Sequence, residues 1–287
     1  MTLNFKQELT AVFGFPVAEN PTQVMVEAAY RHHGLDWRYL TIEVPPRDLA
    51  DAVAGARAMG FGGFNLTIPH KVSVMPLLDR IGESAEVIGA VNCVVAREGE
   101  LVGENTDGRG FLESLRAVRD PAGLRVVLLG AGGAARAVAV ELALAGAESI
   151  TVVNRTAQRG EELAGHLRDK LGAKAAFQQW SDRIAVPSGT DLLVNATSIG
   201  LFPDVEACAP LDFDSLDRDV VVADVIPNPP LTPLLRKAGE RGCRTIDGLG
   251  MLINQGRIGI RYWTGLDPDP AVMRAALEKV FNSTAAG

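Results

Sequence analysis

The sequence predicts an α/β protein whose second half forms a doubly wound parallel sheet. From Arg125 onward, short apolar segments alternate with stretches of helical length, beginning at Val126–Leu129. A short, wholly apolar strand is typical of a parallel sheet covered on both faces. A glycine-rich turn follows this strand, and aromatic residues make up only 6% of the chain. Small side chains of this kind suit helices that pack closely on a sheet.

The first half of the chain alternates in the same way but contains an antiparallel part. Strands are expected at Leu9–Phe13, Asp36–Val44 and Gly63–Leu66, helices at Thr22–His33 and Arg47–Met59, and a hairpin at Val91–Val95 and Glu100–Glu104. Pro69 is expected to open a helix containing Lys71–Arg80, because proline suits a first helical turn. Later strands are expected at Ser149–Val153, Asp191–Val194, Val220–Val225 and near Thr245. We therefore expect one domain at 1–108, joined by the last helices at 251–287, and a second at 109–250.

Composition limits the classes of partner. The 287 residues have a formal net charge of −7, which argues against nucleic acid because phosphate binding needs a basic surface. Three well-separated cysteines, Cys93, Cys208 and Cys243, have no metal-ligand spacing and favour a reducing compartment. No segment resembles a signal peptide or a membrane span. The expectation is a cytoplasmic protein with no membrane partner and no metal; the sequence leaves monomer or homodimer open.

The turn Gly130-Ala131-Gly132-Gly133-Ala134-Ala135 follows a predicted strand and opens a predicted helix. In this context Gly130 permits a tight turn, and Gly132 lets the backbone approach a pyrophosphate. Ala135 stands at the position where the helix packs on the sheet. The helix N-terminus offers unpaired N–H groups to the phosphates. The sequence therefore predicts a dinucleotide site.

The end of the next strand bears on the choice of dinucleotide. An enzyme selective for NAD usually has Asp or Glu there, accepting from the ribose 2′-hydroxyl. This chain has Asn154-Arg155-Thr156, with Arg159 nearby. Two guanidinium groups can pair with a 2′-phosphate, so NADP is favoured. The alternatives are that both arginines are ordinary surface residues and that NAD is used.

Several polar residues occur in otherwise apolar surroundings, in the segments Asn65–Lys71, Ala90–Asn92, Gly103–Gly108 and Gly248–Gln255. Hydride transfer between an alcohol and a ketone needs a group that takes or gives the hydroxyl proton. A lysine can do this, and an aspartate can orient it. Lys71 and Asp107 are the candidates; taken singly, each could equally be a surface lysine or a helix cap.

Together these segments resemble the shikimate dehydrogenase family, nearly from end to end. The matching segments are Gly63–Lys71, Gly89–Asn92, Asn105–Gly108, Gly130–Ala135, Asn154–Thr156, Asn195–Ser198, Thr232–Leu235, Gly248–Leu252 and Trp263–Gly265. So many ordered matches do not arise by chance.

The resemblance implies an open α/β substrate domain and a Rossmann domain, with the active site in the cleft between them. It implies interconversion of 3-dehydroshikimate and shikimate, a step on the chorismate pathway of aromatic amino acid biosynthesis. By the same resemblance Lys71 and Asp107 handle the proton, and Asn65, Thr67, Asn92 and Gln255 hold the ring hydroxyls of a small cyclic acid. Thr197, Ser198 and Gly248 are expected along the cofactor.

The resemblance breaks at the residues expected around the substrate carboxylate. The family has two serines where this chain has Asn20 and Thr22, and a tyrosine where it has Pro227. Asn and Thr can still donate to a carboxylate, but Glu19 adds a negative charge beside them. Three readings stay open: retained shikimate activity, a dehydrogenase of quinate or another shikimate-like polyol acid, and a non-catalytic dinucleotide or metabolite sensor. The presence of both Lys71 and Asp107 argues against the sensor.

Overall fold

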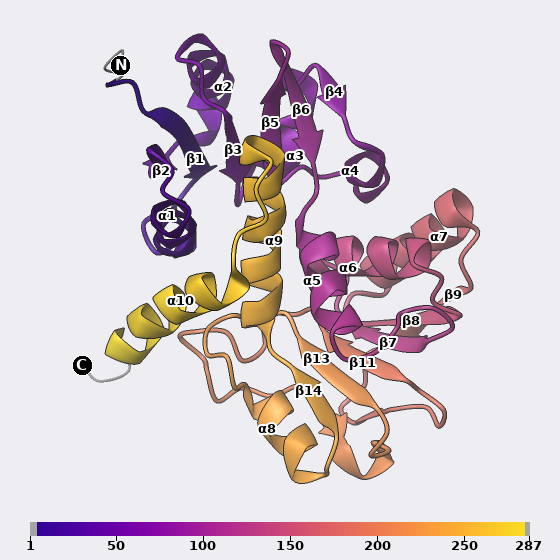
Figure 1. Cartoon of the computed structure of the whole chain (residues 1–287). Helices are drawn as coiled ribbons and strands as arrows, with labels where there is room; N and C mark the ends of the chain where they lie inside the picture. Colours follow the sequence, from indigo (N-terminus) through magenta and orange to yellow (C-terminus); the bar gives the residue numbers. More distant parts are fainter. Residues whose placement is uncertain (1–4, 285–287) are drawn as a thin grey trace. The chain divides into compact units, whose positions relative to one another are not determined.

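The computed structural model describes residues 5–284, and these divide into two compact units (Figure 1). The first unit contains the chain up to Thr106 and the residues from Gln255 onward; the second runs from Asp107 to Asn254. The chain therefore passes between the units twice. The second passage lies within one helix, α9 (Gly248–Thr264).

The first unit is built on a six-stranded mixed sheet in the order β2-β1-β3-β5-β6-β4. Its strands are β1 (Glu8–Gly14), β2 (Trp37–Glu43), β3 (Gly63–Leu66), β4 (Arg80–Ile81), β5 (Cys93–Arg97) and β6 (Glu100–Glu104). β1 pairs parallel with β2 and β3. β5 runs antiparallel to β3 and β6, which confirms the predicted hairpin. Its turn has positive φ at Glu98 and Gly99, the backbone of a tight two-residue hairpin loop.

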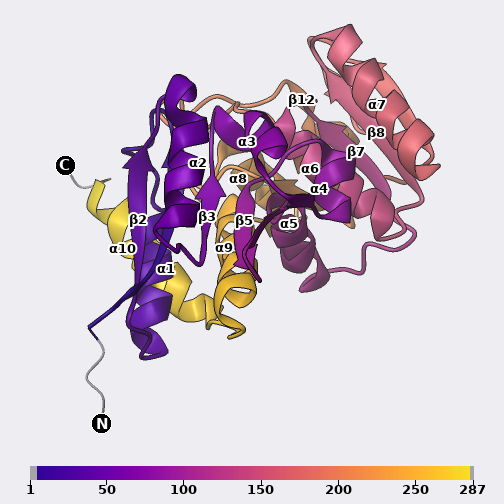
Figure 2. The same ribbon diagram turned by 90° about the horizontal axis from the view of Figure 1, so that it is seen from above.

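Helices cover both faces of this sheet (Figure 2). They are α1 (Thr22–His32), α2 (Leu49–Ala58) after a 3-10 turn at Pro46–Asp48, α4 (Glu83–Ile88), α9 and α10 (Pro270–Thr284). On one face, Leu49 and Val53 of α2 join Phe13 and Phe64 in a buried core. On the other face, Trp263 of α9 donates from Nε1 to the carbonyl of Val94, 3.0 Å away.

The helix expected to contain Lys71–Arg80 is much shorter than the sequence suggests. α3 covers His70–Ser73 and is followed by a 3-10 turn at Met75–Leu77. Pro76 explains the difference, because proline has no N–H and its ring collides with the carbonyl four residues earlier. Arg80 instead begins strand β4. Lys71 therefore stands on one isolated helical turn.

The second unit confirms the predicted doubly wound sheet. Its strands are β7 (Arg125–Leu129), β8 (Ser149–Asn154), β9 (Ala175–Gln179), β11 (Leu192–Asn195), β13 (Val221–Asp224) and β14 (Arg244–Ile246). They run parallel in the order β14-β13-β11-β7-β8-β9. The chain proceeds outward from β7 in one direction and then from β11 in the other. Ligands of such sheets bind at the carboxyl ends of the strands where the order reverses, which here is between β7 and β11.

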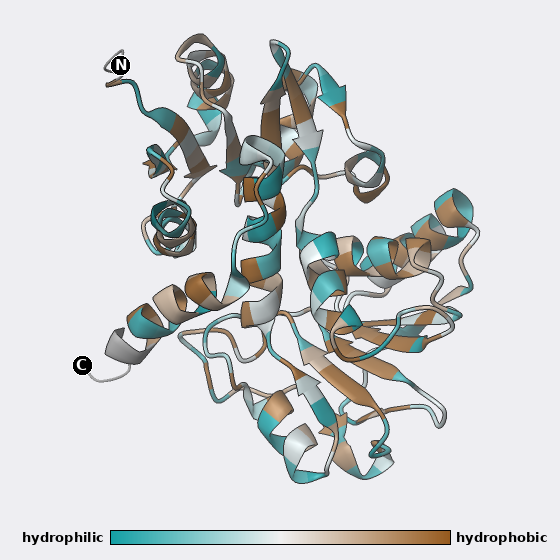
Figure 3. Ribbon diagram, viewed as in Figure 1, coloured by the Kyte–Doolittle hydropathy of each residue, from teal (hydrophilic) through white to brown (hydrophobic). Residues whose placement is uncertain are grey.

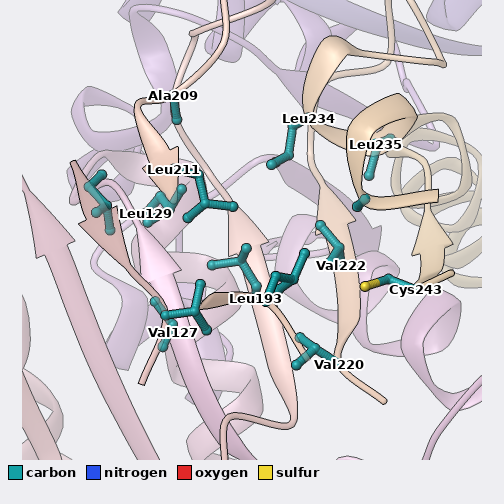
Figure 4. Close-up of a cluster of buried hydrophobic side chains, with 14 of the residues drawn as sticks. Val127, Leu129, Leu193, Ala209, Leu211, Val220, Val222, Leu234, Leu235 and Cys243 are labelled. Carbon is teal, nitrogen blue, oxygen red and sulfur yellow. The ribbon is translucent and has the colours of Figure 1, made fainter. Parts of the chain in front are cut away.

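Helices lie on both faces of this second sheet. α6 (Gly133–Leu144) and α7 (Ala157–Leu171) lie along one face, beside α5 (Asp107–Arg116) (Figure 1). α8 (Pro233–Glu240) covers the other, where Leu234 and Leu235 pack against Leu193 and Val222 (Figure 4). Two short strands, β10 (Ile184–Ala185) and β12 (Leu211–Asp212), pair separately, and a 3-10 turn follows at Phe213–Ser215. The inner strands β7, β11 and β13 of the second unit consist mostly of hydrophobic residues (Figure 3).

No helix within the described residues is both long and apolar enough to cross a membrane.

Candidate active site

The glycine-rich turn lies at the reversal point of the second unit's sheet. Gly130 directly follows β7 and has a φ of +107°, a backbone conformation that side-chain-bearing residues rarely adopt. A Cβ at Gly130 would stand 2.9 Å from the carbonyl oxygen of Ala196. Glycine is therefore required here both for the turn and for the close approach of the segment after β11.

The start of α6 offers backbone donors to an anion. Gly132 precedes the helix in an extended conformation, and no side chain caps the helix there. The N–H groups of Gly133, Ala134 and Ala135 have no acceptor within the helix, because the first turn of any helix lacks them. A Cβ at Gly132 or Gly133 would meet no atom within 4 Å. The turn thus leaves open space in front of a positively polarised helix end, which fits a dinucleotide pyrophosphate.

The end of β8 supplies two cations beside this turn. Arg155 and Arg159 are both exposed, and within the described residues neither guanidinium group forms an ion pair. Asn154 is half-buried, and its Nδ2 donates to the carbonyl of Thr156 at 2.8 Å. The side chain of Gln179 donates to the carbonyl of Arg155 at 3.0 Å. These bonds shape the loop and leave the two arginines available for a 2′-phosphate.

The remaining residues expected along the cofactor follow β11 and begin α9. Thr197 is half-buried and Ser198 is exposed. Gly248 is buried, and a Cβ there would collide with the carbonyl oxygen of Ile226. In this structure Gly248 therefore allows the start of α9 to pack against the chain after β13.

In the first unit, Lys71 is the second residue of α3 and is half-buried. Its backbone is fixed from two directions. The carbonyl of Lys71 accepts from the N–H of Val91 at 2.7 Å. The preceding residue, His70, is fully buried and its Nε2 lies 2.7 Å from the carbonyl oxygen of Val44. The isolated turn carrying Lys71 is thus held by contacts with two other segments.

A buried hydrogen-bond network links the polar residues near Lys71. Tyr39 Oη donates to Asn65 Oδ1 at 2.7 Å, and Asn65 Nδ2 donates to the carbonyl of Asn92 at 3.0 Å. Asn92 Oδ1 accepts from the backbone N–H of Thr106 at 2.6 Å. Gln255 Oε1 accepts from Thr106 Oγ1 at 3.4 Å. All five residues are at most 7% exposed, so their side chains are held in fixed positions.

Three polar side chains of the first unit have a donor that no described residue accepts. In the part of the chain that the structure describes, the hydroxyls of Thr22 and Thr67 and the Nε2 of Gln255 make no hydrogen bond. Asn65, by contrast, already uses its oxygen and its nitrogen once each, which leaves one lone pair and one N–H. Groups of this kind can hold the hydroxyls of a small molecule.

The residues that differ from the family at the expected carboxylate end range from buried to exposed. Asn20 is half-buried, and its Oδ1 accepts from the N–H of Thr22 at 3.0 Å. Thr22 is buried at the first position of α1, and Glu19 is exposed. The second unit contains Pro227, which is half-buried after β13. The amide oxygen of Asn20 is therefore committed to the backbone, while the Thr22 hydroxyl is available.

Asp107 is the first residue of α5 and of the second unit, and it is half-buried. It directly follows Thr106, which the first unit holds through Asn92.

The sequence did not single out Tyr39, Thr106 or Asp224. A tyrosine within a strand carries no sequence signal that distinguishes a polar role from ordinary core packing.

Comparison with known families matches most of the chain to one group. Residues 12–94 match the shikimate dehydrogenase substrate-binding domain, residues 114–200 the shikimate/quinate 5-dehydrogenase model, and residues 248–278 the shikimate 5′-dehydrogenase C-terminal domain. Shikimate dehydrogenase (NADP(+)) of Citrifermentans bemidjiense is 44% identical over 283 residues, covering 96% of this chain and 97% of that protein.

Two solved structures resemble this chain over almost its whole length. Ligand-free 5-ketofructose reductase of Gluconobacter sp. strain CHM43 is 56% identical, with a TM-score of 0.94 and coverage of 97% of this chain and 100% of that one. Shikimate 5-dehydrogenase of Thermus thermophilus, in complex with NADP(H) and shikimate, is 38% identical, with a TM-score of 0.83 and coverage of 95% and 99%.

Proposed function

Because this chain belongs to the shikimate dehydrogenase family, we propose that it interconverts 3-dehydroshikimate and shikimate, or a closely similar hydroxylated substrate, using NADP. It is an NAD(P)-dependent oxidoreductase that acts on a CH–OH group. The full-length match to relatives named as NADP-dependent enzymes carries the proposal. The uncapped start of α6 supports NADP as the cofactor, as do Arg155 and Arg159, which are exposed and form no ion pair with any residue that the structure describes.

In the proposed reaction the dinucleotide accepts or supplies the hydride, and the protein handles the proton. In the reducing direction, the Lys71 ammonium group gives a proton to the carbonyl oxygen as the alcohol forms. In the oxidising direction, neutral Lys71 takes the hydroxyl proton. We assign Asp107 the role of orienting Lys71 and holding its charge.

The substrate hydroxyls would be held by the polar residues of the first unit. Thr67 and Gln255 have hydrogen-bonding capacity that the described residues do not use, and Asn92 is fixed by Thr106. Asn65 would act through its remaining N–H and lone pair, with its orientation set by Tyr39. We also infer that the protein works on this small molecule in the cytoplasm, since its three cysteines form no disulfide within the described residues, as is typical of a reducing compartment.

A second candidate substrate is an uncharged polyhydroxylated ketone, as in the name of the 56%-identical 5-ketofructose reductase. The observation that favours it is the set of residues at the expected carboxylate end. Burying a carboxylate requires a cation or several N–H donors. Asn20 has its oxygen bonded to Thr22 N–H, Pro227 offers no donor, and Glu19 carries a negative charge. The neutral hydroxyls of a polyhydroxylated ketone need hydrogen-bond partners but no cation.

Steady-state rates with matched substrates separate the two candidates. Shikimate and quinate would be tested for oxidation with NADP and NAD, and 5-ketofructose for reduction with NADPH and NADH. Turnover of shikimate supports the first candidate; turnover of 5-ketofructose alone supports the second. Tight dinucleotide binding with no turnover of any of them would contradict both and favour a sensor.

The variant Glu19→Gln sharpens this comparison. It should increase kcat/KM for shikimate, because it removes a negative charge beside the carboxylate, and leave 5-ketofructose unaffected. Glu148→Gln, an exposed glutamate of the second unit, is the matched control and should change neither rate. Equal effects of Glu19→Gln on both substrates would show that Glu19 does not discriminate by charge.

A further inference from the structure

A buried carboxylate, Asp224, lies at the carboxyl end of β13 and is only 1% exposed. It accepts hydrogen bonds from three groups. Asn195 Nδ2 lies 3.1 Å from each carboxylate oxygen, Thr232 Oγ1 lies 2.8 Å from Oδ2, and the N–H of Ile226 lies 3.1 Å from Oδ1. Burial raises the pKa of Asp224 to about 6, because a buried carboxylate is less stable in its charged form than one in water. The hydrogen bonds to Asp224 offset part of this cost.

Asp224 determines which way the Asn195 side chain points. The two residues are direct partners in the pairing of β11 with β13. An ionised carboxylate only accepts hydrogen bonds, so the Asn195 NH₂ group must face it. The Asn195 oxygen is therefore turned toward the segment that follows β11.

The Asn195 oxygen in turn holds Thr197. It accepts from Thr197 Oγ1 at 2.7 Å and from Thr197 N–H at 3.2 Å. Thr197 Oγ1 then accepts from the N–H of Ile199 at 3.1 Å. The donors Ile199 N–H, Thr197 Oγ1 and Asn195 Nδ2 thus form a chain that ends on the Asp224 carboxylate. Asn195 Nδ2 also lies 3.4 Å from the carbonyl oxygen of Ile199, which ties the amide to the same segment.

The segment held in this way touches the dinucleotide turn. A Cβ at Gly130 would lie 2.9 Å from the Ala196 oxygen and 3.1 Å from Thr197 Cγ2. A shift of Thr197 would therefore change the packing against Gly130, the residue that permits the turn. The segment also lies where the strand order reverses, the place where such sheets bind their ligands.

We propose that Asp224 is a positioning residue for the dinucleotide: through the Asn195 amide, it holds residues 196–199 against the Gly130 turn in the geometry that binds the cofactor. The inference rests on the proposed function for the identity of the cofactor. Asp224 itself touches neither cofactor nor substrate in this proposal. Its influence passes only through the orientation of Asn195.

Exchanging the two side chains tests this role. Asn195→Asp places two carboxylates face to face and removes the donor between them. The exchange variant, with Asn195→Asp and Asp224→Asn together, restores a donor on one side and acceptors on the other. In it, the new amide at 224 can donate to both the residue at 195 and Thr232, and its oxygen can accept from Ile226.

The readout is binding of NADPH to the full chain, measured by fluorescence titration, which needs no substrate. Asn195→Asp should weaken NADPH binding about tenfold or more, and the exchange variant should return within about threefold of the wild-type Kd. Adenosine 2′-monophosphate serves as a second ligand, since Arg155 and Arg159 should hold it without residues 196–199. Its affinity should stay constant in all variants. Asp212→Asn, which alters a carboxylate elsewhere in the same unit, should leave both affinities unchanged.

Several results would overturn the inference. Unchanged NADPH binding in Asn195→Asp would do so, as would an exchange variant that folds but binds NADPH tenfold more weakly than wild type. An equal loss of both ligands would show a general structural defect instead of positioning. If Asn195→Asp does not fold, the exchange variant still decides the matter, since it must fold and bind. A wild-type chain that binds neither NADPH nor NADP would overturn the proposed function as well.

Discussion

Removing one hydroxyl, in the variant Tyr39→Phe, should disturb the substrate site of the first unit. Tyr39 lies on β2 and reaches across β1 to Asn65 on β3, because Thr10 of β1 pairs with both Tyr39 and Gly63. Its hydroxyl is fully buried and donates to Asn65 Oδ1 at 2.7 Å. The change leaves the ring in place and deprives Asn65 of its only donor partner among the described residues.

The expected loss of stability follows from this arrangement. A net hydrogen bond contributes about 1 kcal/mol, and a buried acceptor left without a partner costs about 1–3 kcal/mol. Asn65 is 5% exposed, so water replaces the lost donor poorly. We expect the free energy of unfolding of the first unit to fall by about 1–3 kcal/mol, as measured by urea denaturation.

The effect on the reaction should exceed that of a general loss of stability. Without Tyr39, the Asn65 amide can rotate and turn its remaining N–H away from the substrate. A loss of about 1 kcal/mol of substrate binding corresponds to roughly a fivefold rise in KM. Because the proposed role of Asn65 is to bind a hydroxyl that does not react, kcat should change little. Steady-state kinetics with the substrate identified above measure both quantities.

Tyr30→Phe is the matched control. Tyr30 is also buried in the first unit, and its hydroxyl lies 2.9 Å from Thr10 Oγ1, which itself donates to the carbonyl of Arg38. This variant should lose about 1 kcal/mol of stability and keep its KM. A Tyr39→Phe enzyme with unchanged KM, or equal KM changes in both variants, would refute the reasoning about Asn65.

Three further predictions concern other parts of the site. Lys71→Ala should lower turnover by about 100-fold or more and leave the Kd for NADPH unchanged in a fluorescence titration; normal turnover would rule out its assigned role. Arg155→Ala should weaken NADP far more than NAD in parallel titrations, because only NADP carries the 2′-phosphate; equal losses would contradict the assignment. The third prediction is a pH dependence of stability. Burial raises the pKa of Asp224 from 3.8 to about 6, so between these values the folded chain binds a proton that the unfolded chain lacks. The contribution of Asp224 to stability should therefore fall by about 2 kcal/mol as pH rises from 4 to 6, and by about 3 kcal/mol over the whole titration, at about 1.4 kcal/mol per pKa unit. Burial raises the pKa of the nearby Cys208 thiol from its usual value, which moves its titration further from this window. Urea denaturation of the wild type and of Asp224→Asn at several pH values measures this difference, and parallel pH profiles would disprove it.

The features that the sequence could predict are those with local causes. The apolar run Val126–Leu129 and the glycines after it predict a buried strand and a tight turn, and both are present. The hairpin after Cys93 depends on a two-residue turn at Glu98 and Gly99. In each case, neighbouring residues are enough to determine the backbone.

Features that depend on strand register or on distant contacts were not predictable. The Tyr39–Asn65 bond exists only because β1 lies between β2 and β3, and no pattern along the chain reveals that order. The same holds for Asp224, whose partner Asn195 is brought beside it by the pairing of β11 with β13. The α3 helix could have been shortened correctly from the sequence, because Pro76 is a local signal.

The sequence did reveal that the residues expected around the substrate carboxylate differ from the family pattern. Asn20, Thr22 and Pro227 stand out only against the pattern that the rest of the chain follows. The structure adds that the Asn20 oxygen is already bonded to Thr22 N–H. Whether the substrate carries a carboxylate therefore remains to be tested by the rate comparison with shikimate and 5-ketofructose.

The hydrogen bond between Thr106 and Gln255 joins the two segments of the first unit. These residues are the last and first of the two segments that make up the first unit, and their side chains lie 3.4 Å apart. The first unit is therefore nearly continuous at the point where the second leaves and re-enters it. Residues 107–254 have the topology of an inserted domain, of the kind tolerated where two chain ends already meet. Residues 107–254 can therefore be removed from the path of the chain on paper while both ends of the first unit stay within hydrogen-bonding distance of each other.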